Sequence, residues 1–332
     1  MHKFKISLLW WTMSAATGFS VCAGAQTTAS GSGSAWPAKS IRFISPYAPG
    51  GGTDILARTL GQKLSENLGV SVVVENRPGA GGLIGTDIVA KSPADGYTLM
   101  LGTPSPITVA PFLYKKMPYD PLRDLTPITL IAVVPAVISV LPSLPAKTVK
   151  EMLALARATP GAMTYSSSGN GGTAHLAGLM LQIMAGLDLT HVPYRGTGPA
   201  LTAVMSGEVT FTAANIISSL PMVKSGRLRA LAVTSEKRSP VLPQVPAVAE
   251  TLPGYSAGPF YGVLGPGGMS AELAARIRNE LVKIIHAPDM KSRLSAEGSE
   301  PIGSTPEGFA ALIKAETARW GKVIKAAKIQ PE

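Results

Sequence analysis

Short apolar runs alternate along this chain with stretches in which apolar residues recur every three or four positions. The first pattern is typical of buried strands and the second of amphipathic helices. Strands are predicted over residues 41–47, 70–75, 97–101, 130–141, 163–167, 189–194, 209–213 and 228–234. Helices are predicted over residues 53–67, 82–91, 148–158, 173–185, 197–206 and 306–328. This alternation predicts an α/β fold with parallel-rich sheets and helices on their faces.

Two local patterns make these predictions more specific. Residues 70–74 read VSVVV, and such a continuous apolar run predicts a strand buried on both faces of a parallel sheet. Thr148 with Glu151, and Ser304 with Glu307, have the spacing of a capping box, so helices are expected to begin at both places.

Two segments are suited to crossing between domains. The apolar strand 130–141 is followed by two prolines, and residues 253–268 are rich in glycine and proline. Because domain boundaries fall in such segments, we expect two domains joined by a hinge. The first consists of residues 36–135 and 260–332, and the second of residues 136–259.

The first 25 residues have the features of a secretory signal peptide. Lys3 and Lys5 precede the mostly apolar residues 6–21, and residues 23–25 form a small-x-small cleavage pattern. Cleavage is therefore predicted after Ala25, with a periplasmic mature protein.

Residues 26–35 are then a flexible, serine- and glycine-rich leader. Two alternatives stay open for the N-terminus. A retained membrane anchor is one, although the apolar run is short for a bilayer span of about 20 residues. Acylation of Cys22 is the other, although the bulky Val21 stands where a small residue is expected.

The composition narrows the function. With 332 residues, 45% of them hydrophobic and 15% charged, the chain is too apolar to be disordered. A single cysteine excludes a disulfide framework and a thiolate zinc site, and four scattered histidines do not suggest another metal site. No cofactor or metal is expected. The net charge of +10 comes from dispersed lysines and arginines with few aromatic residues, so no nucleic-acid partner is expected.

Glycines are concentrated where predicted strands end and helices begin. The turns span residues 46–54 (PYAPGGGTD), 166–175 (SSSGNGGTAH) and 193–200 (PYRGTGPA). Glycine lets a ligand approach the backbone, and the N–H groups of a first helical turn have no partner within the helix. Such helix starts attract anions. Several of them, contributed by two domains, are expected to hold a small carboxylate without a salt bridge.

The same turns have other interpretations. Each alone can be an ordinary strand-to-helix turn, and serines or a histidine there are more often caps than a nucleophile and its base. Residues 169–174, GNGGTA, also fit the dinucleotide fingerprint, but the acidic residue expected after the next strand is missing. Because Arg195 stands there and would suit NADP, the alternative function is an exported enzyme or an NADP-dependent oxidoreductase.

Several blocks, in order, resemble the extracytoplasmic receptors of tripartite tricarboxylate transporters, the Bug-type solute-binding proteins. They are residues 36–58 (WPAKSIRFISPYAPGGGTDILAR), 75–103 (ENRPGAGGLIGTDIVAKSPADGYTLMLGT), 166–178 (SSSGNGGTAHLAG), 191–201 (HVPYRGTGPAL) and 226–240 (GRLRALAVTSEKRSP). The resemblance extends from Trp36 to about Lys325. It implies a type II periplasmic binding protein fold, in which two hinged α/β domains close over a small carboxylate that is passed to membrane partners.

In the family, loops corresponding to residues 47–54 and 166–173 clasp the ligand through backbone N–H groups and ordered water. One carboxylate is then expected against residues 50–53 and the far end of the ligand near residues 167–172. The candidate ligand-binding residues are Tyr47, Gly50, Gly51, Gly52, Thr53, Asp54, Ser167, Ser168, Gly169, Asn170, Gly171, Gly172, Thr173, Arg195 and Asn215.

This chain departs from the family pattern at two positions. Gly172 stands where a hydroxyl residue is usual, and Thr173 beside it can compensate. Ala214 stands where many members have an aspartate, which favours plain or aromatic carboxylates over zwitterions. The neighbouring Asn215 is either a ligand contact or a buried structural residue.

We therefore expect a non-catalytic periplasmic receptor for a small di-, tri- or aromatic carboxylate. It is expected to act as a monomer and to serve the membrane components of a tripartite tricarboxylate-type transporter. A role in sensing rather than uptake stays open.

Overall fold

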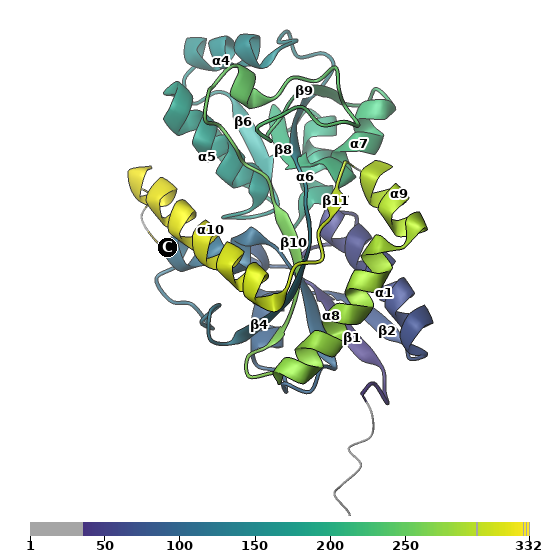
Figure 1. Cartoon of the computed structure of the whole chain (residues 1–332). Coiled ribbons are helices and arrows are strands. Elements are labelled where there is room, and N and C mark those ends of the chain that lie inside the picture. Colours follow the sequence, from purple (N-terminus) through teal and green to yellow (C-terminus); the bar gives the residue numbers. More distant parts are fainter. Residues whose placement is uncertain (1–35, 297, 328, 330, 332) are drawn as a thin grey trace, which may run out of the picture. The chain divides into compact units, whose positions relative to one another are not determined.

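Two mixed β-sheets form the centre of the computed structural model (Figure 1). It describes residues 36–296, 298–327, 329 and 331, so the predicted signal peptide, the leader and Cys22 lie outside the described residues. The first sheet has the strand order β11-β4-β10-β3-β1-β2 and the second β7-β6-β8-β5-β9. The strands are β1 (Ile41–Ser45), β2 (Val72–Asn76), β3 (Thr98–Gly102), β4 (Leu125–Val133), β5 (Ala136–Val140), β6 (Thr164–Ser167), β7 (Thr190–Pro193), β8 (Phe211–Asn215), β9 (Arg229–Val233), β10 (Phe260–Pro266) and β11 (Glu300–Pro301).

Helices cover these sheets. They are α1 (Gly52–Leu68), α2 (Leu83–Ala90), α3 (Ala110–Leu113), α4 (Val149–Ala158), α5 (Thr173–Ala185), α6 (Thr197–Met205), α7 (Ile216–Lys224), α8 (Ala271–His286), α9 (Pro288–Ala296) and α10 (Pro306–Ala326). All six predicted helices are present, with ends within two residues of the prediction. Helices α3, α7, α8 and α9 and strands β10 and β11 were not predicted. Within the described part of the chain, no helix is long and apolar enough to cross a bilayer.

The sheets are less parallel than predicted. Strand β1 is parallel to β2 and β3, and β6 is parallel to β7 and β8. In contrast, β10 is antiparallel to β3 and β4, β11 is antiparallel to β4, and β5 is antiparallel to β8 and β9. Parallel neighbouring strands are joined by a crossover that is usually an α-helix. Strand β5 instead follows β4 directly, and no α-helix lies between β9 and β10. The strand–helix alternation therefore describes only three of the six strands in the first sheet and three of the five in the second.

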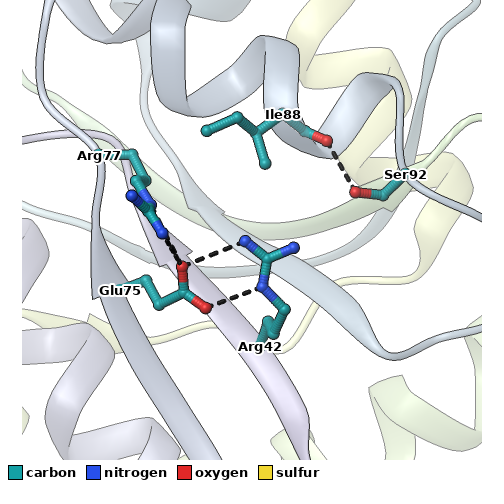
Figure 2. Close-up of polar contacts among 5 residues, drawn as sticks. All are labelled: Arg42, Glu75, Arg77, Ile88 and Ser92. Carbon is teal, nitrogen blue, oxygen red and sulfur yellow. Dashed lines mark hydrogen bonds and ion pairs between the residues drawn. The ribbon is translucent and has the colours of Figure 1, made fainter.

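Strand β2 was predicted to be buried on both faces, and this is wrong. It is the edge strand of the first sheet, and Val73 is 48% exposed. Its polar end carries the ion-pair cluster of Figure 2, in which Glu75 accepts hydrogen bonds from Arg42 Nε (2.8 Å) and Arg77 Nη2 (2.6 Å). These bonds, above all the one from Arg42, lower the pKa of Glu75 to about 2. Charged groups along an edge strand discourage pairing with another chain.

The predicted strand 130–141 is in fact two strands in different sheets. Strand β4 ends at Val133 and β5 begins at Ala136, so the chain passes from the first sheet to the second within two residues. Pro135 lies between them and cannot donate a ladder hydrogen bond. The chain returns to the first sheet at β10. The predicted domain limits themselves remain a prediction.

One of the two predicted capping boxes is shifted. Thr148 caps α4 by accepting a hydrogen bond from the Glu151 N–H (3.1 Å), as expected. Helix α10, however, is capped by Thr305, which accepts from the Gly308 N–H (3.1 Å). Ser304 instead accepts a hydrogen bond from the N–H of Leu130 in β4 (3.0 Å), so tertiary contact decides its role.

The long helix α10 packs against the cores of both sheets. Phe309 and Ile313, in its first half, belong to a buried cluster with residues of β1, β3, β4 and β10. Trp320 and Ile324, in its second half, belong to a cluster with residues of β5, β6 and β8. We call the first sheet with α1, α2 and α8 the first lobe, and the second sheet with α4–α7 the second lobe. Helix α10 thus joins the two lobes in addition to the crossing strands.

Candidate functional site

The carboxyl ends of strands from both lobes surround one small cavity. In α/β sheets this is the edge at which ligands usually bind. The cavity has a volume of about 30 Å³. It is lined by Tyr47, Thr53, Thr103, Pro104, Ser105, Ser168, Thr173, Ala174, Thr197, Ala200, Thr212, Ala213, Ala214, Asn215, Pro259 and Tyr261. The first and second glycine turns, which are far apart in the sequence, therefore meet at a shared cavity.

Three helices begin at this cavity without a capping side chain. Gly51, Gly172 and Gly196 are the N-cap residues of α1, α5 and α6. Because glycine has no side chain, none of the three can accept a hydrogen bond from the N–H groups of the first helical turn. Thr53, Thr173 and Thr197, in the first turns, line the cavity. By contrast, α4, α8 and α10 begin with a threonine or serine whose hydroxyl accepts an N–H of the first turn. The N–H groups of α1, α5 and α6 are thus available to an anion.

The cavity wall is polar but carries no formal charge. Among the described residues that line it there is no aspartate, glutamate, lysine, arginine or histidine. Nine of them carry a hydroxyl group: Tyr47, Thr53, Thr103, Ser105, Ser168, Thr173, Thr197, Thr212 and Tyr261. Because hydroxyl groups both donate and accept, this wall can solvate a carboxylate without a counter-ion.

The two tyrosines of the wall are neutral hydroxyl donors. Tyr47 Oη donates a hydrogen bond to the Gly81 carbonyl oxygen (3.2 Å) and lies 2.9 Å from Thr103 Oγ1. Burial raises the pKa of Tyr47 to about 12. Burial also raises the pKa of Tyr261, on β10. Both groups therefore stay protonated near neutral pH and do not repel an anion.

Asn215 has a structural role in the helix cap of α7 and also lines the cavity. Its Oδ1 accepts hydrogen bonds from the backbone N–H and the hydroxyl group of Ser218, both at 3.0 Å, and so caps α7. The residue is 6% exposed and lines the cavity. Since Oδ1 is engaged, its Nδ2 hydrogens are the part of the amide suited to an anionic solute.

Asp54 is held away from the cavity by a local network. Its carboxylate accepts hydrogen bonds from the Gly50 N–H (3.0 Å) and from Asn76 Nδ2 (2.9 Å), and pairs with Arg58 Nε (3.0 Å). Burial alone would raise the pKa of Asp54, but these bonds outweigh it and hold the pKa below its ordinary value. Asp54 thus shapes the first glycine turn and is not among the cavity-lining residues.

Gly51 and Gly52 of the first turn face the opposite lobe, whereas a Cβ atom on Gly50 would have no neighbour within 4 Å. A Cβ atom built on Gly52 would overlap Asn215 Oδ1 and lie 2.8 Å from its Cγ, and one on Gly51 would lie 3.3 Å from Thr197 Cβ. Gly81 lies outside this turn, but a Cβ atom on it would likewise overlap an atom of the other lobe, the Asn170 carbonyl oxygen; its φ is +63°. We expected glycine here to admit a ligand. In the structure, the absence of a side chain at Gly51 and Gly52 leaves room for the other lobe.

In the second glycine turn, Ser168, Thr173 and the unpredicted Ala174 line the cavity, whereas the other predicted residues of this turn do not. Ser167 is fully buried and its Oγ is 2.6 Å from His191 Nε2. The Asn170 carbonyl oxygen accepts a hydrogen bond from Ser105 Oγ of the first lobe (3.0 Å). Gly169, Gly171 and Gly172 form the turn itself, closed by the Gly172 N–H donating to the Gly169 carbonyl (2.9 Å).

Arg195 contributes its backbone rather than its side chain. Its carbonyl oxygen accepts a hydrogen bond from the Ala48 N–H of the first lobe (3.1 Å). The side chain belongs to an exposed residue and does not line the cavity. With Ser105 and Asn170, this pair forms a direct hydrogen-bonded contact between the lobes.

Several cavity residues were not predicted. Thr103 and Ser105 follow β3 in a turn without glycine, so the glycine criterion passed over them, although a strand end followed by hydroxyl residues was visible. Tyr261 lies on β10, which was not predicted because residues 253–268 contain many glycines and prolines. Within the described residues, no group of three or more metal-ligating side chains occurs.

Comparison with known proteins agrees with this geometry. Residues 56–329 match the family model described as tripartite tricarboxylate transporter family receptor. Protein BugT of Bordetella pertussis is 36% identical over 292 residues, which are 87% of this chain and 90% of BugT.

Two solved structures of Rhodopseudomonas palustris proteins share the fold. Rpa4515, solved with adipate, has a TM-score of 0.86 and 38% identity over 90% of this chain and 100% of its own. MatC, solved with bound malate, has a TM-score of 0.83 and 29% identity over 87% of this chain and 100% of its own. This chain therefore belongs to the tripartite tricarboxylate transporter receptor family, as a Bug-type solute-binding receptor with the two-domain, type II periplasmic binding protein fold.

Proposed function

We propose that this protein captures a small carboxylate between its two lobes and delivers it to the membrane components of a tripartite tricarboxylate-type transporter. The observation that carries the proposal is the convergence of three uncapped helix starts, from both lobes, on an uncharged and hydroxyl-lined cavity. A helix start contributes about 0.3–1 kcal/mol to anion binding when exposed and up to ~2 kcal/mol when partly buried. Each hydrogen bond to a charged group adds roughly 1.5–3 kcal/mol. These two contributions overlap, because the same N–H groups make both, and they are offset in part by the loss of translational and rotational freedom on association.

The arrangement of donors favours a dicarboxylate. Helix α1 belongs to the first lobe and helices α5 and α6 to the second, so each lobe can bind one carboxylate of the ligand. Adipate and malate, present in the related structures of Rpa4515 and MatC, are both dicarboxylates. We assign Thr53, with the N–H groups of Gly52 and Thr53, to one carboxylate. Ser168 and Thr173 belong to the other, with Asn215 as a donor between them.

Capture requires the lobes to move. The cavity of about 30 Å³ is too small for a solute of several carbon atoms. A solute of several carbon atoms therefore enters and leaves by separation of the lobes about the crossing segments. Because the ligand contacts both lobes only when they are together, it stabilises the closed form, which the membrane partners can then recognise.

The remaining parts of the proposal are the location and the absence of catalysis. The family and the N-terminal sequence support a periplasmic receptor that releases its ligand unchanged. The alternative of an exported or NADP-dependent enzyme rested on residues 169–174, and this turn lies at the cavity shared by the lobes, where a receptor needs it.

Isothermal titration calorimetry tests the proposal with adipate, malate, hexanoate and 1,6-hexanediol. The first two are expected to bind saturably, hexanoate more weakly because it has one carboxylate, and the diol not at all. Tight binding of the diol would show that the carboxylates are not what the site recognises. No saturable binding by any carboxylate in a wider panel of mono-, di-, tri- and aromatic acids would refute the function.

A further inference from the structure

A column of four stacked rings runs through the second lobe and ends beneath the second glycine turn. Tyr165 on β6 is in register with both Phe211 on β8 and His191 on β7, so the three rings lie side by side on one face of the sheet. The Tyr165 ring lies 5.4 Å from that of Phe211 and 5.0 Å from that of His191. His175, from the first turn of α5, completes the column at 4.1 Å from His191, nearly parallel to it.

The two histidines hold opposite ends of one loop, residues 167–171. His191 Nε2 lies 2.6 Å from Ser167 Oγ, at the start of the loop. His175 Nδ1 accepts a hydrogen bond from the Gly171 N–H (2.9 Å), at its end. Between these points Ser168 lines the cavity and Asn170 contacts the first lobe.

The hydrogen bonds require a particular proton arrangement. His175 Nδ1 must be unprotonated, because it accepts from the Gly171 N–H. Ser167 Oγ accepts from the Gly169 N–H (3.1 Å) and donates to the Gly169 carbonyl oxygen (3.0 Å). The Ser167 hydroxyl group also lies against His191 Nε2, and it either donates to an unprotonated Nε2 or accepts from a protonated one, according to the tautomer of the ring. Burial supports two neutral rings, since it lowers the pKa of His175 to about 4 and that of His191 to about 3.

We propose that His175 and His191 are positioning residues for ligand binding: as a stacked neutral pair they fix the loop 167–171, and so set the position of Ser168 and of the α5 N-terminus. The proposal rests on the proposed function for its effect on affinity, but the positioning itself can be measured without a ligand. If the two rings only filled the core, their function would not depend on the hydrogen bonds that His175 Nδ1 and His191 Nε2 make with the loop.

Amide substitutions separate these possibilities because each matches one ring nitrogen. The amide of asparagine can replace Nδ1, and that of glutamine can replace Nε2. His175→Asn and His191→Gln should therefore keep the loop bonds, whereas His175→Gln and His191→Asn should lose them. In adipate titrations we expect the first pair to stay within about threefold of the wild type and the second pair to lose about tenfold or more in affinity.

Hydrogen exchange at the Gly169 and Gly171 amides, followed by NMR without ligand, is the second readout. Faster exchange in His175→Gln and His191→Asn, with near-native rates in their partners, supports the clamp even if the wild type binds no carboxylate. Equal exchange and equal affinity within each pair overturns it while leaving the receptor function intact. Long-range nitrogen NMR spectra give a further check, because a proton on Nδ1 of His175 in the native protein contradicts the proposal.

Discussion

Single glycines decide how closely the two lobes of this protein approach. Gly52 is the clearest case, because a side chain there would occupy the position of the Asn215 amide across the cavity. Its backbone lies within α1, so alanine is compatible with the local conformation. The need for glycine at this residue is therefore set by the opposite lobe and not by the turn.

Gly52→Ala is expected to abolish tight ligand binding, with an affinity loss of about 100-fold, on the order of two hydrogen bonds to a charged group. The thermal stability of the ligand-free protein should change little. Gly308→Ala is the matched control, because Gly308 lies in the first turn of α10, is exposed and does not line the cavity. Unchanged adipate affinity in Gly52→Ala would show that the lobes need not approach as closely as described.

The histidine pair makes stability depend on pH. Both folded pKa values lie below the ordinary value of 6.5, so below pH 6.5 the unfolded chain binds protons that the folded protein does not. The free energy of unfolding should therefore fall as the pH drops from 6.5 toward 4. The slope is at most about 1.4 kcal/mol per pH unit for each histidine, and less because both rings are only partly buried.

Urea unfolding at pH 7, 6 and 5 measures this dependence. The double variant His175→Asn/His191→Gln has no titrating ring at either position and should show a shallower slope than the wild type. Parallel slopes for the two proteins would assign the pH dependence to other groups.

At the scale of elements, the helices were the most predictable part of the chain. Periodicity placed α5 at its observed limits and α1 within one residue at each end, because an amphipathic face must meet the core every three or four residues. Local cap signals were less reliable, since Ser304 has the right spacing but bonds to β4 instead. The sequence singled out the glycine turns before α1, α5 and α6 as candidate anion sites, and residues from all three helix starts line the cavity, whereas Thr103 and Tyr261 required the tertiary structure.

Capped and uncapped helix starts should respond oppositely to loss of a threonine hydroxyl. Thr305→Ala removes the cap of α10 and is expected to lower stability by about 1 kcal/mol without changing ligand affinity. Thr173→Ala, at the uncapped start of α5, should weaken adipate binding severalfold and leave stability within about 0.5 kcal/mol. Chemical denaturation and calorimetry on both variants provide the comparison, and a stability loss confined to Thr173→Ala would reverse the assignment.

At the scale of the whole molecule, the prediction of two crossings was informative but incomplete. The passage through Pro135 was concealed within a continuous apolar run, since both adjoining strands are buried. Strand β2 was predicted to be buried on both faces because its run of valines does not reveal that it is the edge strand of the sheet. Sheet order and strand direction depend on contacts far apart in the sequence, which local patterns do not encode.

Joining the lobes covalently should prevent ligand exchange. A Cβ built on Gly196 would lie 3.2 Å from the Ala48 Cβ of the other lobe, close to the ~3.8 Å of a disulfide. In the mature protein, which is predicted to lack cysteine, oxidised Ala48→Cys/Gly196→Cys should take up adipate at least about tenfold more slowly than the reduced form. Stopped-flow measurements before and after adding reductant test this, and equal uptake rates would mean that solutes enter without separation of the lobes.

The hydroxyl-rich wall has a consequence for how the binding site can diversify. A rotating O–H bond can present either its proton or a lone pair to the same point in space. A cavity built from such groups can reverse its local polarity without moving a heavy atom, and can match solutes whose oxygens differ in protonation or placement. New substrate preferences can then arise from exchanges among serine, threonine, alanine and tyrosine that leave the surrounding scaffold unchanged.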